Sequence, residues 1–258
     1  MLIVDQYAYS NQLSSVHPVE KMIFSLTTLL IALISNSIIV SVVVIFVMSG
    51  LLVLKAKIPK LVFLKLLLVP LSFIIMGLIP IIISVTTSKH DFIVQMSYWG
   101  LTLGISSANL ITAVELLFRT TASVCCLYFL ALTTPMIEIN SMLRKLKIPA
   151  VFIEFMNLVY RLLFILLDTA HQIKVAQLSR GGYSSIKNTF TSLAYLGSNL
   201  LVKAYYRAKK LSLALKARGY KGKIEVLERD HHLSKRNLSI IAVTEIVLVI
   251  FSILVEVV

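Results

Sequence analysis

Charged residues are scarce in this chain. Only 14% of its 258 residues are Asp, Glu, Lys or Arg, whereas soluble domains carry about a quarter. Apolar residues make up 58%, and the mean hydropathy is +0.90. This scarcity of charge excludes a soluble globular protein. Long apolar runs recur to the last residue, and they predict an all-α membrane protein that crosses the bilayer several times.

Patterns for metal binding and catalysis are also lacking. The two cysteines, Cys125 and Cys126, are adjacent in an apolar run, where we expect buried core residues and no C-x-x-C site. The histidines and acidic residues show no metal-ligand spacing, and no nucleophile has a suitably spaced base. We therefore predict no catalytic residue, no metal site and no nucleic-acid partner. The chain has no G-x-x-x-x-G-K-[ST] motif, so any ATP and Mg would be bound by partner subunits.

Five apolar segments have the length of a membrane-spanning helix, which is about 20 residues. The first follows a polar segment, unlike the short basic start of a cleavable signal peptide. Pro70, Gly77 and Pro80 predict kinks in the third. In chain order the five segments are 19–35, 38–54, 61–87, 106–132 and 238–258.

Basic residues between these segments predict the orientation. One group lies between the second and third segments, and another follows the fourth. The positive-inside rule places both groups in the cytoplasm. The N-terminus is then cytoplasmic, the turn at 89–91 is external, and the C-terminus is external, in a multi-pass protein of the cell membrane. The two groups are Lys55, Lys57 and Lys60, and Arg144, Lys145 and Lys147.

Positive charge is concentrated in one part of the chain. Residues 133–236 contain 18 Lys and Arg against 6 Asp and Glu, a net +12, and the rest of the chain has a net charge of only +1. We interpret 1–132 as a membrane bundle of four spans and 237–258 as the last span. Residues 133–236 are interpreted as a large cytoplasmic region of basic amphipathic coupling helices.

Two segments of the basic region leave an alternative open. Residues 151–167 and 186–202 are moderately apolar, but the first contains Glu154, Asn157 and Arg161. A charge at the centre of a span costs a few kcal/mol on insertion. We favour long helices that lie against the cytoplasmic face. The alternative is a seven-span protein in which both segments cross and Arg180 lies in an external turn.

Two short basic stretches within this region resemble each other. They read Ser179-Arg180-Gly181 and Ala217-Arg218-Gly219, and the arginines are 38 positions apart. Each predicts a helix end, with the arginine in the last turn and the glycine as a C-terminal cap. Such a cation can contact anionic lipid. Alternatively, a guanidinium between small residues can enter an acidic groove of a partner, and two similar ends would fit two similar grooves.

A few polar groups require separate interpretation. Glu115 and Arg119 are spaced i,i+4 inside the fourth predicted span, and we interpret them as a structural pair within the membrane. Glu245 in the last span is expected to face the interior of the bundle. His17 precedes Pro18 at a predicted helix start, where capping or an interfacial position is expected.

Nearly the whole chain resembles the transmembrane (T) component of energy-coupling factor (ECF) importers, a branch of the ABC transporters, and most closely the CbiQ type of cobalt and nickel systems. Members of that family carry two Ala-Arg-Gly/Ser-type motifs at the ends of coupling helices. Residues 217–219 match this motif, and residues 179–181 depart from it by a serine in place of alanine. The other matching positions are DQYAYSN at 5–11, VHP at 16–18, Lys21, Arg119, LTTP at 132–135, LRKLKIP at 143–149 and Arg161.

The resemblance implies that this chain is a coupling subunit and not an enzyme. Its partners would be two cytosolic ABC ATPases, docked by Arg180 and Arg218, and a substrate-binding (S) subunit in the membrane. The implied cargo is cobalt, or nickel, read by the partner subunit. A T component of a vitamin importer is the nearest alternative. From other classes, the alternatives are a membrane-bound enzyme for lipid or polyprenyl substrates, and a basic membrane anchor or permease whose arginines bind lipid.

Overall fold

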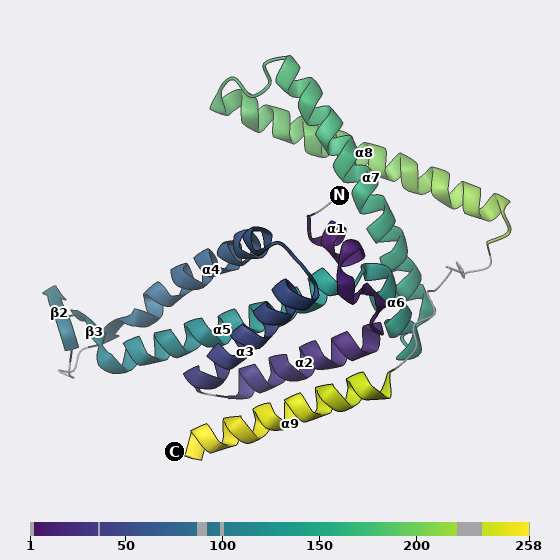
Figure 1. Cartoon of the computed structure of the whole chain (residues 1–258). Helices are drawn as coiled ribbons and strands as arrows, with labels where there is room; N and C mark the ends of the chain where they lie inside the picture. Colours follow the sequence, from purple (N-terminus) through teal and green to yellow (C-terminus); the bar gives the residue numbers. More distant parts are fainter. Residues whose placement is uncertain (1–2, 36, 87–91, 99–100, 221–233, 258) are drawn as a thin grey trace. The chain divides into compact units, whose positions relative to one another are not determined.

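The computed structural model describes residues 3–35, 37–86, 92–98, 101–220 and 234–257. Helices dominate these ranges, which confirms the predicted all-α membrane protein (Figure 1). Contacts divide the chain into two units, each described by itself below. The bundle unit comprises Leu2–Pro135 with Asp230–Val258, and the hairpin unit comprises Met136–Arg229. The predicted turn at 89–91 lies outside the described residues.

The bundle unit is built around one long helix, α5 (Ser107–Thr133). Helix α5 contacts α1, α2, α3 and α4, and α9 packs on α2 and α3 (Figure 1). The helix bounds are α1 Ile3–Ser10, the 3₁₀ helix η1 Gln12–Ser15, α2 Pro18–Ile34, α3 Ile38–Gly50, the π-helix η2 Leu51–Lys55, α4 Lys60–Ile82 and α9 Lys235–Val257.

The core of the bundle unit lies where α2, α3 and α5 meet. Cys125 and Cys126 are fully buried free thiols within it, as predicted for core residues. Phe24 and Phe129 meet edge to face, with ring centroids 5.7 Å apart. The start of α2 follows the expected pattern, because His17 caps it by accepting a hydrogen bond at Nδ1 from the Val19 amide, 3.1 Å away.

Polar side chains of α2 connect it to the ends of its neighbours. Buried Glu20 accepts hydrogen bonds from the Ser234 amide (2.8 Å) and from Asn237 Nδ2 (3.0 Å) at the start of α9. Buried Lys21 donates from Nζ to the Thr133 carbonyl at the end of α5 (2.8 Å). Each charge thus lies at the helix end whose dipole it complements. Deeper in the bundle, Thr28 donates to Glu245 (2.7 Å), so Glu245 does face the interior.

A small antiparallel sheet follows α4 (Figure 1). Its strand order is β1-β3-β2. The sequence analysis did not predict this sheet. Its strands are β1 Ile83–Thr86, β2 Phe92–Tyr98 and β3 Leu101–Ser106, and Val85 pairs with Leu103. The predicted third span, 61–87, is therefore helical only to Ile82. The β-branched residues that follow Ile82 favour a strand, and β3 supplies its partner.

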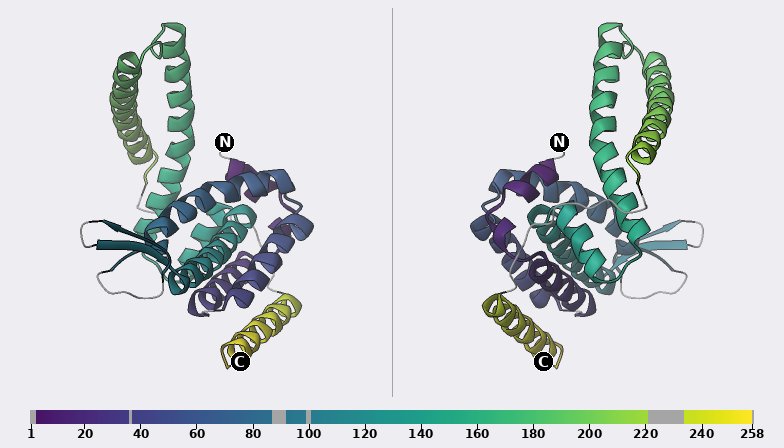
Figure 2. Two further views of the ribbon diagram at one scale, coloured as in Figure 1. Left: turned by 90° about the vertical axis from the view of Figure 1, so that its left-hand side faces the viewer. Right: turned by 90° about the vertical axis from the view of Figure 1, so that its right-hand side faces the viewer.

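The hairpin unit consists of α6 (Met136–Lys145), α7 (Ala150–Ser179) and α8 (Ile186–Ala217). Helices α7 and α8 are the two arms of an antiparallel hairpin, and a short turn joins them (Figure 2). At 1.5 Å per residue, the arms are about 45 and 48 Å long. The segments 151–167 and 186–202 are thus the first halves of two long continuous helices.

Five described helices are long and apolar enough to cross a membrane, judged by length and composition alone. The number of helices agrees with the prediction, but they are not the same five segments. Helix α7 is one of the five, whereas α2, with 17 residues, is not. Glu154 and Arg161 lie within the 30-residue helix α7, and its position against the cytoplasmic face stays a prediction. The seven-span alternative requires that both α7 and α8 cross the membrane. Helix α8 does not meet this criterion of length and composition, so the structure does not support that alternative.

Candidate functional site: two arginine-bearing helix ends

Helix α7 ends in a Schellman motif at the first arginine-glycine pair. Arg180 is the C-terminal cap, with φ −97° and ψ 12°. Gly181 adopts φ +70°, a left-handed conformation that glycine enters without steric cost. Two reverse hydrogen bonds close the turn, from the Gly181 amide to the Leu178 carbonyl (3.0 Å) and from the Gly182 amide to the Gln177 carbonyl (2.8 Å).

Helix α8 ends in the same motif. Arg218 is the cap, with φ −91° and ψ 10°, and Gly219 has φ +71°. The corresponding hydrogen bonds run from the Gly219 amide to the Lys216 carbonyl and from the Tyr220 amide to the Leu215 carbonyl, both 3.0 Å. The predicted helix ends are confirmed, and each arginine is the cap itself.

Both arginines are exposed, and their neighbours in the motifs are small. Ser179 and Ala217 occupy the equivalent last helical position, and Gly181 and Gly219 the equivalent left-handed one. No atom lies within 4 Å of where a Cβ would sit on either glycine. The structure therefore presents two exposed arginines at helix caps with closely similar backbone angles, and each is accessible to a partner.

Side chains around the α7–α8 turn support the Arg180 end. Gln177 donates to the Ser192 carbonyl (2.8 Å) and accepts from the Tyr183 hydroxyl (2.9 Å). Ser192 donates to the Gly182 carbonyl (2.7 Å). A Cβ on Gly182 would lie 2.9 Å from the Gln177 carbonyl oxygen, so only glycine fits there. The first arginine is thus held by contacts within the tip of the hairpin.

The Arg218 end is supported by the opposite end of α7. Tyr220 donates a hydrogen bond from its hydroxyl to the Glu154 carboxylate, which lies one turn into α7 and is largely buried. This hydrogen bond raises the pKa of the Tyr220 phenol, with smaller contributions from burial and from the charge of Glu154. Asn140 of α6 donates to Asn157, one turn beyond Glu154 (2.6 Å). The second arginine is thus coupled to the α6–α7 junction.

A third contact joins the arms midway. Arg207 donates from Nη1 to the Thr169 hydroxyl (3.1 Å) and to the Ile165 carbonyl (3.3 Å). The sequence analysis treated Glu154 as an obstacle to membrane insertion and did not single out Arg207. It assigned neither residue a partner, because these contacts span 38 and 66 positions in the chain. The only feature of the sequence that could have indicated such a contact was an acidic residue, Glu154, within an apolar helix.

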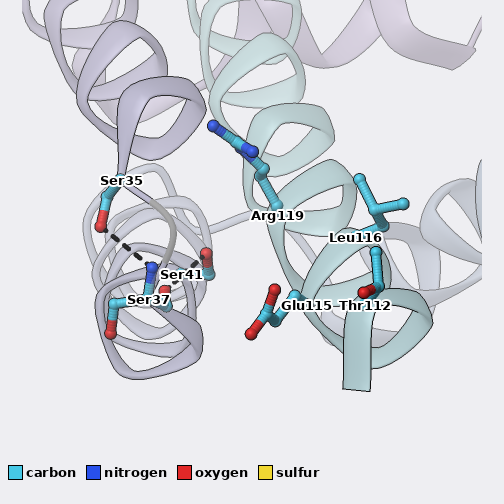
Figure 3. Close-up of a pocket in the computed structure, with 7 residues that line it drawn as sticks. All are labelled: Ser35, Ser37, Ser41, Thr112, Glu115, Leu116 and Arg119. Carbon is cyan, nitrogen blue, oxygen red and sulfur yellow. Dashed lines mark hydrogen bonds between the residues drawn. The ribbon is translucent and has the colours of Figure 1, made fainter. Parts of the chain in front are cut away.

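The predicted intramembrane pair lies in the bundle unit. Glu115 and Arg119 extend from α5 toward the turn between α2 and α3, where they line a polar cavity with Ser35, Ser37 and Ser41 (Figure 3). Its volume is about 170 Å³. Their mutual pairing stays a prediction. Among the described residues, no group of three or more His, Cys, Asp and Glu side chains comes together as a metal site would require.

Comparison with known proteins identifies the family. Residues 9–229 match the family model of CbiQ, described as cobalt transport protein. An uncharacterized protein of Methanocaldococcus jannaschii is 34% identical over 97% of this chain and 92% of its own length. The energy-coupling factor transporter transmembrane protein EcfT of Bacillus subtilis is 29% identical over 60% of this chain and 64% of its own length.

A third relative is a longer protein. The putative fused cobalt transport protein CbiMQ of Methanocorpusculum labreanum is 30% identical over 98% of this chain, which spans only 42% of the fused protein. The remainder of that protein has no counterpart in this chain.

Proposed function

Since this chain belongs to the CbiQ cobalt transport protein family, we propose that it is the transmembrane coupling subunit of an ECF importer for cobalt ions. Arg180 and Arg218 dock into acidic grooves on two cytosolic ABC ATPases. The hairpin transmits ATP-driven motion of the ATPases to a substrate-binding membrane subunit. The chain acts mechanically and catalyses no reaction itself.

The observation that carries the proposal is the identity of the two helix ends. Arg180 and Arg218 have closely similar backbone angles and the same pattern of capping hydrogen bonds, and each is followed by glycine and preceded by a small residue, serine in one case and alanine in the other. Lipid contact alone requires no such duplication, because any exposed cation near the surface attracts anionic headgroups. Two copies of one shape suit two copies of one receptor, such as a pair of related ATPases.

Charge and geometry support arginine in this role. A guanidinium presents a planar set of donors that can pair with a carboxylate through two hydrogen bonds. The helix C-terminus carries partial negative charge, so the cation is stabilised before docking. Helix α8 separates the two arginines along the chain and is about 48 Å long. One groove cannot hold both ends, and two separate receptors can.

The hairpin is suited to transmit motion. Its arms are tied at the tip by Gln177 and Ser192, midway by Arg207 and Thr169, and at the far end by Tyr220 and Glu154. Tied helices move as levers and do not bend independently. A change in the distance between two ATPases would therefore displace the arms, and with them any membrane partner that they contact.

The membrane partner and the cargo are inferred from relatives. The CbiMQ protein of M. labreanum joins a CbiQ-like part to a further segment, which supports a partner subunit that acts beside this chain. Cobalt is proposed from the family description. Uptake of radioactive Co²⁺ by vesicles that contain the whole complex tests the cargo, with Ni²⁺ as competitor. If only Ni²⁺ is transported, or neither ion, cobalt is the wrong cargo. The coupling role is tested separately by the docking experiment below.

Charge reversal tests docking. Arg180→Glu with Arg218→Glu should abolish co-purification of both ATPases and leave membrane insertion intact. Each single variant should weaken the co-purification. Lys203→Glu with Lys209→Glu is the matched control, because it makes the same charge change at exposed positions in the interior of α8. Normal ATPase recovery from the arginine double variant contradicts the proposal. If the arginine double variant binds anionic liposomes more weakly and still recovers the ATPases normally, the result supports the lipid-anchor alternative instead.

A further inference from the structure

A groove in the bundle unit has no role in the proposed coupling mechanism. It lies between α2, α3 with η2, and α9, and its volume is about 260 Å³. Its walls are mostly apolar. Phe24 and Phe129 form part of the wall on one side, and Ile240 and Ile241 of α9 line the other. The groove separates α9 in part from the rest of the bundle.

The polar groups on the floor of the groove already have partners. Glu20 accepts from the start of α9, and Lys21 donates to the Thr133 and Leu13 carbonyls. These groups therefore do not require a polar ligand in the groove. The apolar wall is different, because Ile240 of α9 is 56% exposed. An apolar occupant would remove that surface from water.

Positive charge gathers at one end of the groove. Val47, Leu51 and Lys55 line it at four-residue spacing, so they form one stripe along α3 and η2 about 12 Å long. Lys55 is exposed at the end of η2, and exposed Lys57 and Lys60 follow in the connection to α4. Leu51–Lys55 is a π-helix, a form that occurs frequently at functional sites.

We infer that this groove binds an anionic phospholipid of the cytoplasmic leaflet, with one acyl chain between α3 and α9 and the phosphate at Lys55. The stripe covers most of one leaflet, which is about 15 Å deep as half of the hydrocarbon core. The lysine group is predicted to face the cytoplasm, where anionic lipids attract basic residues. A basic rim on an apolar groove fits a lipid that has both a charge and a chain.

The occupant has a structural consequence for α9. Among the described elements, α9 makes its main contacts with α2 and α3. A chain held between α9 and α3 would complete this packing. Binding of the lipid is therefore expected to stabilise the purified full-length protein, and this inference does not depend on the docking of ATPases.

Native mass spectrometry of the purified full-length chain tests the site, with phosphatidylglycerol and phosphatidylcholine of the same acyl chains as probes. Wild type should retain phosphatidylglycerol in preference. Lys55→Gln should reduce that preference about fivefold, the size of one basic residue's contribution at an anionic surface. Lys65→Gln is the matched control, because Lys65 is exposed on α4 and does not line the groove. Ile240→Trp, which fills the groove from an exposed position, should reduce retention of both lipids.

Three results would overturn the inference. One is equal retention of the two lipids by wild type, and a second is an unchanged preference in Lys55→Gln. The third is an equal loss in Lys65→Gln, which would indicate a general surface effect. The melting temperature in detergent gives a second measurement. Phosphatidylglycerol should raise it for wild type more than phosphatidylcholine does, and Ile240→Trp should remove that difference. A folded Ile240→Trp protein that keeps the full difference also contradicts the site.

Discussion

Tyr220 donates a hydrogen bond to Glu154, and this contact ties the end of α8 that bears Arg218 to the first turns of α7. Tyr183, the tyrosine that follows the other arginine motif, bonds instead to Gln177 within the tip of the hairpin. The two arginine ends are thus alike in backbone and different in support. One depends on local contacts, and the other depends on a residue 66 positions away.

Tyr220→Phe should loosen the Arg218 end and leave the Arg180 end unchanged. Loss of the hydroxyl removes the side-chain bond between the arms at their far end, so the last turn of α8 should open more often. Hydrogen exchange of the backbone amides over 213–217 should become faster. Tyr183→Phe is the control, and its effect should be confined to the tip around Ser192. Equal exchange in wild type and Tyr220→Phe would show that the hydroxyl does not hold this end.

The same bond predicts a dependence on alkaline pH. The hydrogen bond to Glu154 raises the pKa of Tyr220 above its usual value of about 10, because the protonated phenol is the donor. The contribution of this bond to stability is therefore fully present below the usual pKa and is lost as the pH rises through the raised value. Ultraviolet titration of wild type minus Tyr220→Phe should give a tyrosinate signal that titrates late, and Glu154→Ala should move it to lower pH.

Three glycines near the arginines should differ in their response to alanine. Gly181 and Gly219 need a positive φ but have open space at Cβ, so alanine should cost about 1 kcal/mol at each through the backbone alone. At Gly182 the new Cβ would meet the Gln177 carbonyl oxygen at 2.9 Å, so the tip of the hairpin must shift. Thermal unfolding of the three variants should rank Gly182→Ala as the most destabilised. A Gly182 variant as stable as the other two would contradict this packing.

Glu20 should control the attachment of α9. Its carboxylate is buried and accepts from the Ser234 amide and from Asn237. Glu20→Ala leaves these donors without their acceptor and should destabilise the protein by about 1–3 kcal/mol. Glu20→Gln keeps one acceptor oxygen and should lose less. Unfolding in detergent measures both, and a Glu20→Ala protein as stable as wild type would show that other contacts suffice to hold α9.

Both arginine motifs should be reached from the cytoplasm. Single cysteines at 180 and 218 are introduced in a background with Cys125→Ala and Cys126→Ala. They should react with an impermeant maleimide only when the reagent has access to the cytoplasmic side of the membrane. The native cysteines are fully buried core residues, so small replacements are required. Labelling of position 180 from the external face would contradict both the predicted orientation and the docking proposal.

Several features of the fold were predictable because they depend on local physics. Long apolar runs between short polar turns predict membrane helices, and an arginine followed by glycine predicts a capped helix end. The sheet at 83–106 was missed because β-branched residues within an apolar run fit both a span and a strand.

The sequence by itself determined the class of the protein and the position of both arginine motifs, because these depend on composition or on contacts a few residues apart. The family followed from the resemblance of its motifs to those of known proteins. Tertiary structure alone decided that Tyr220 meets Glu154, that Arg207 meets Thr169, and that Lys55 borders an apolar groove beside α9. These pairings join residues tens to hundreds of positions apart. Packing of whole helices brings such residues together, and no local preference of the chain records which pairs will meet.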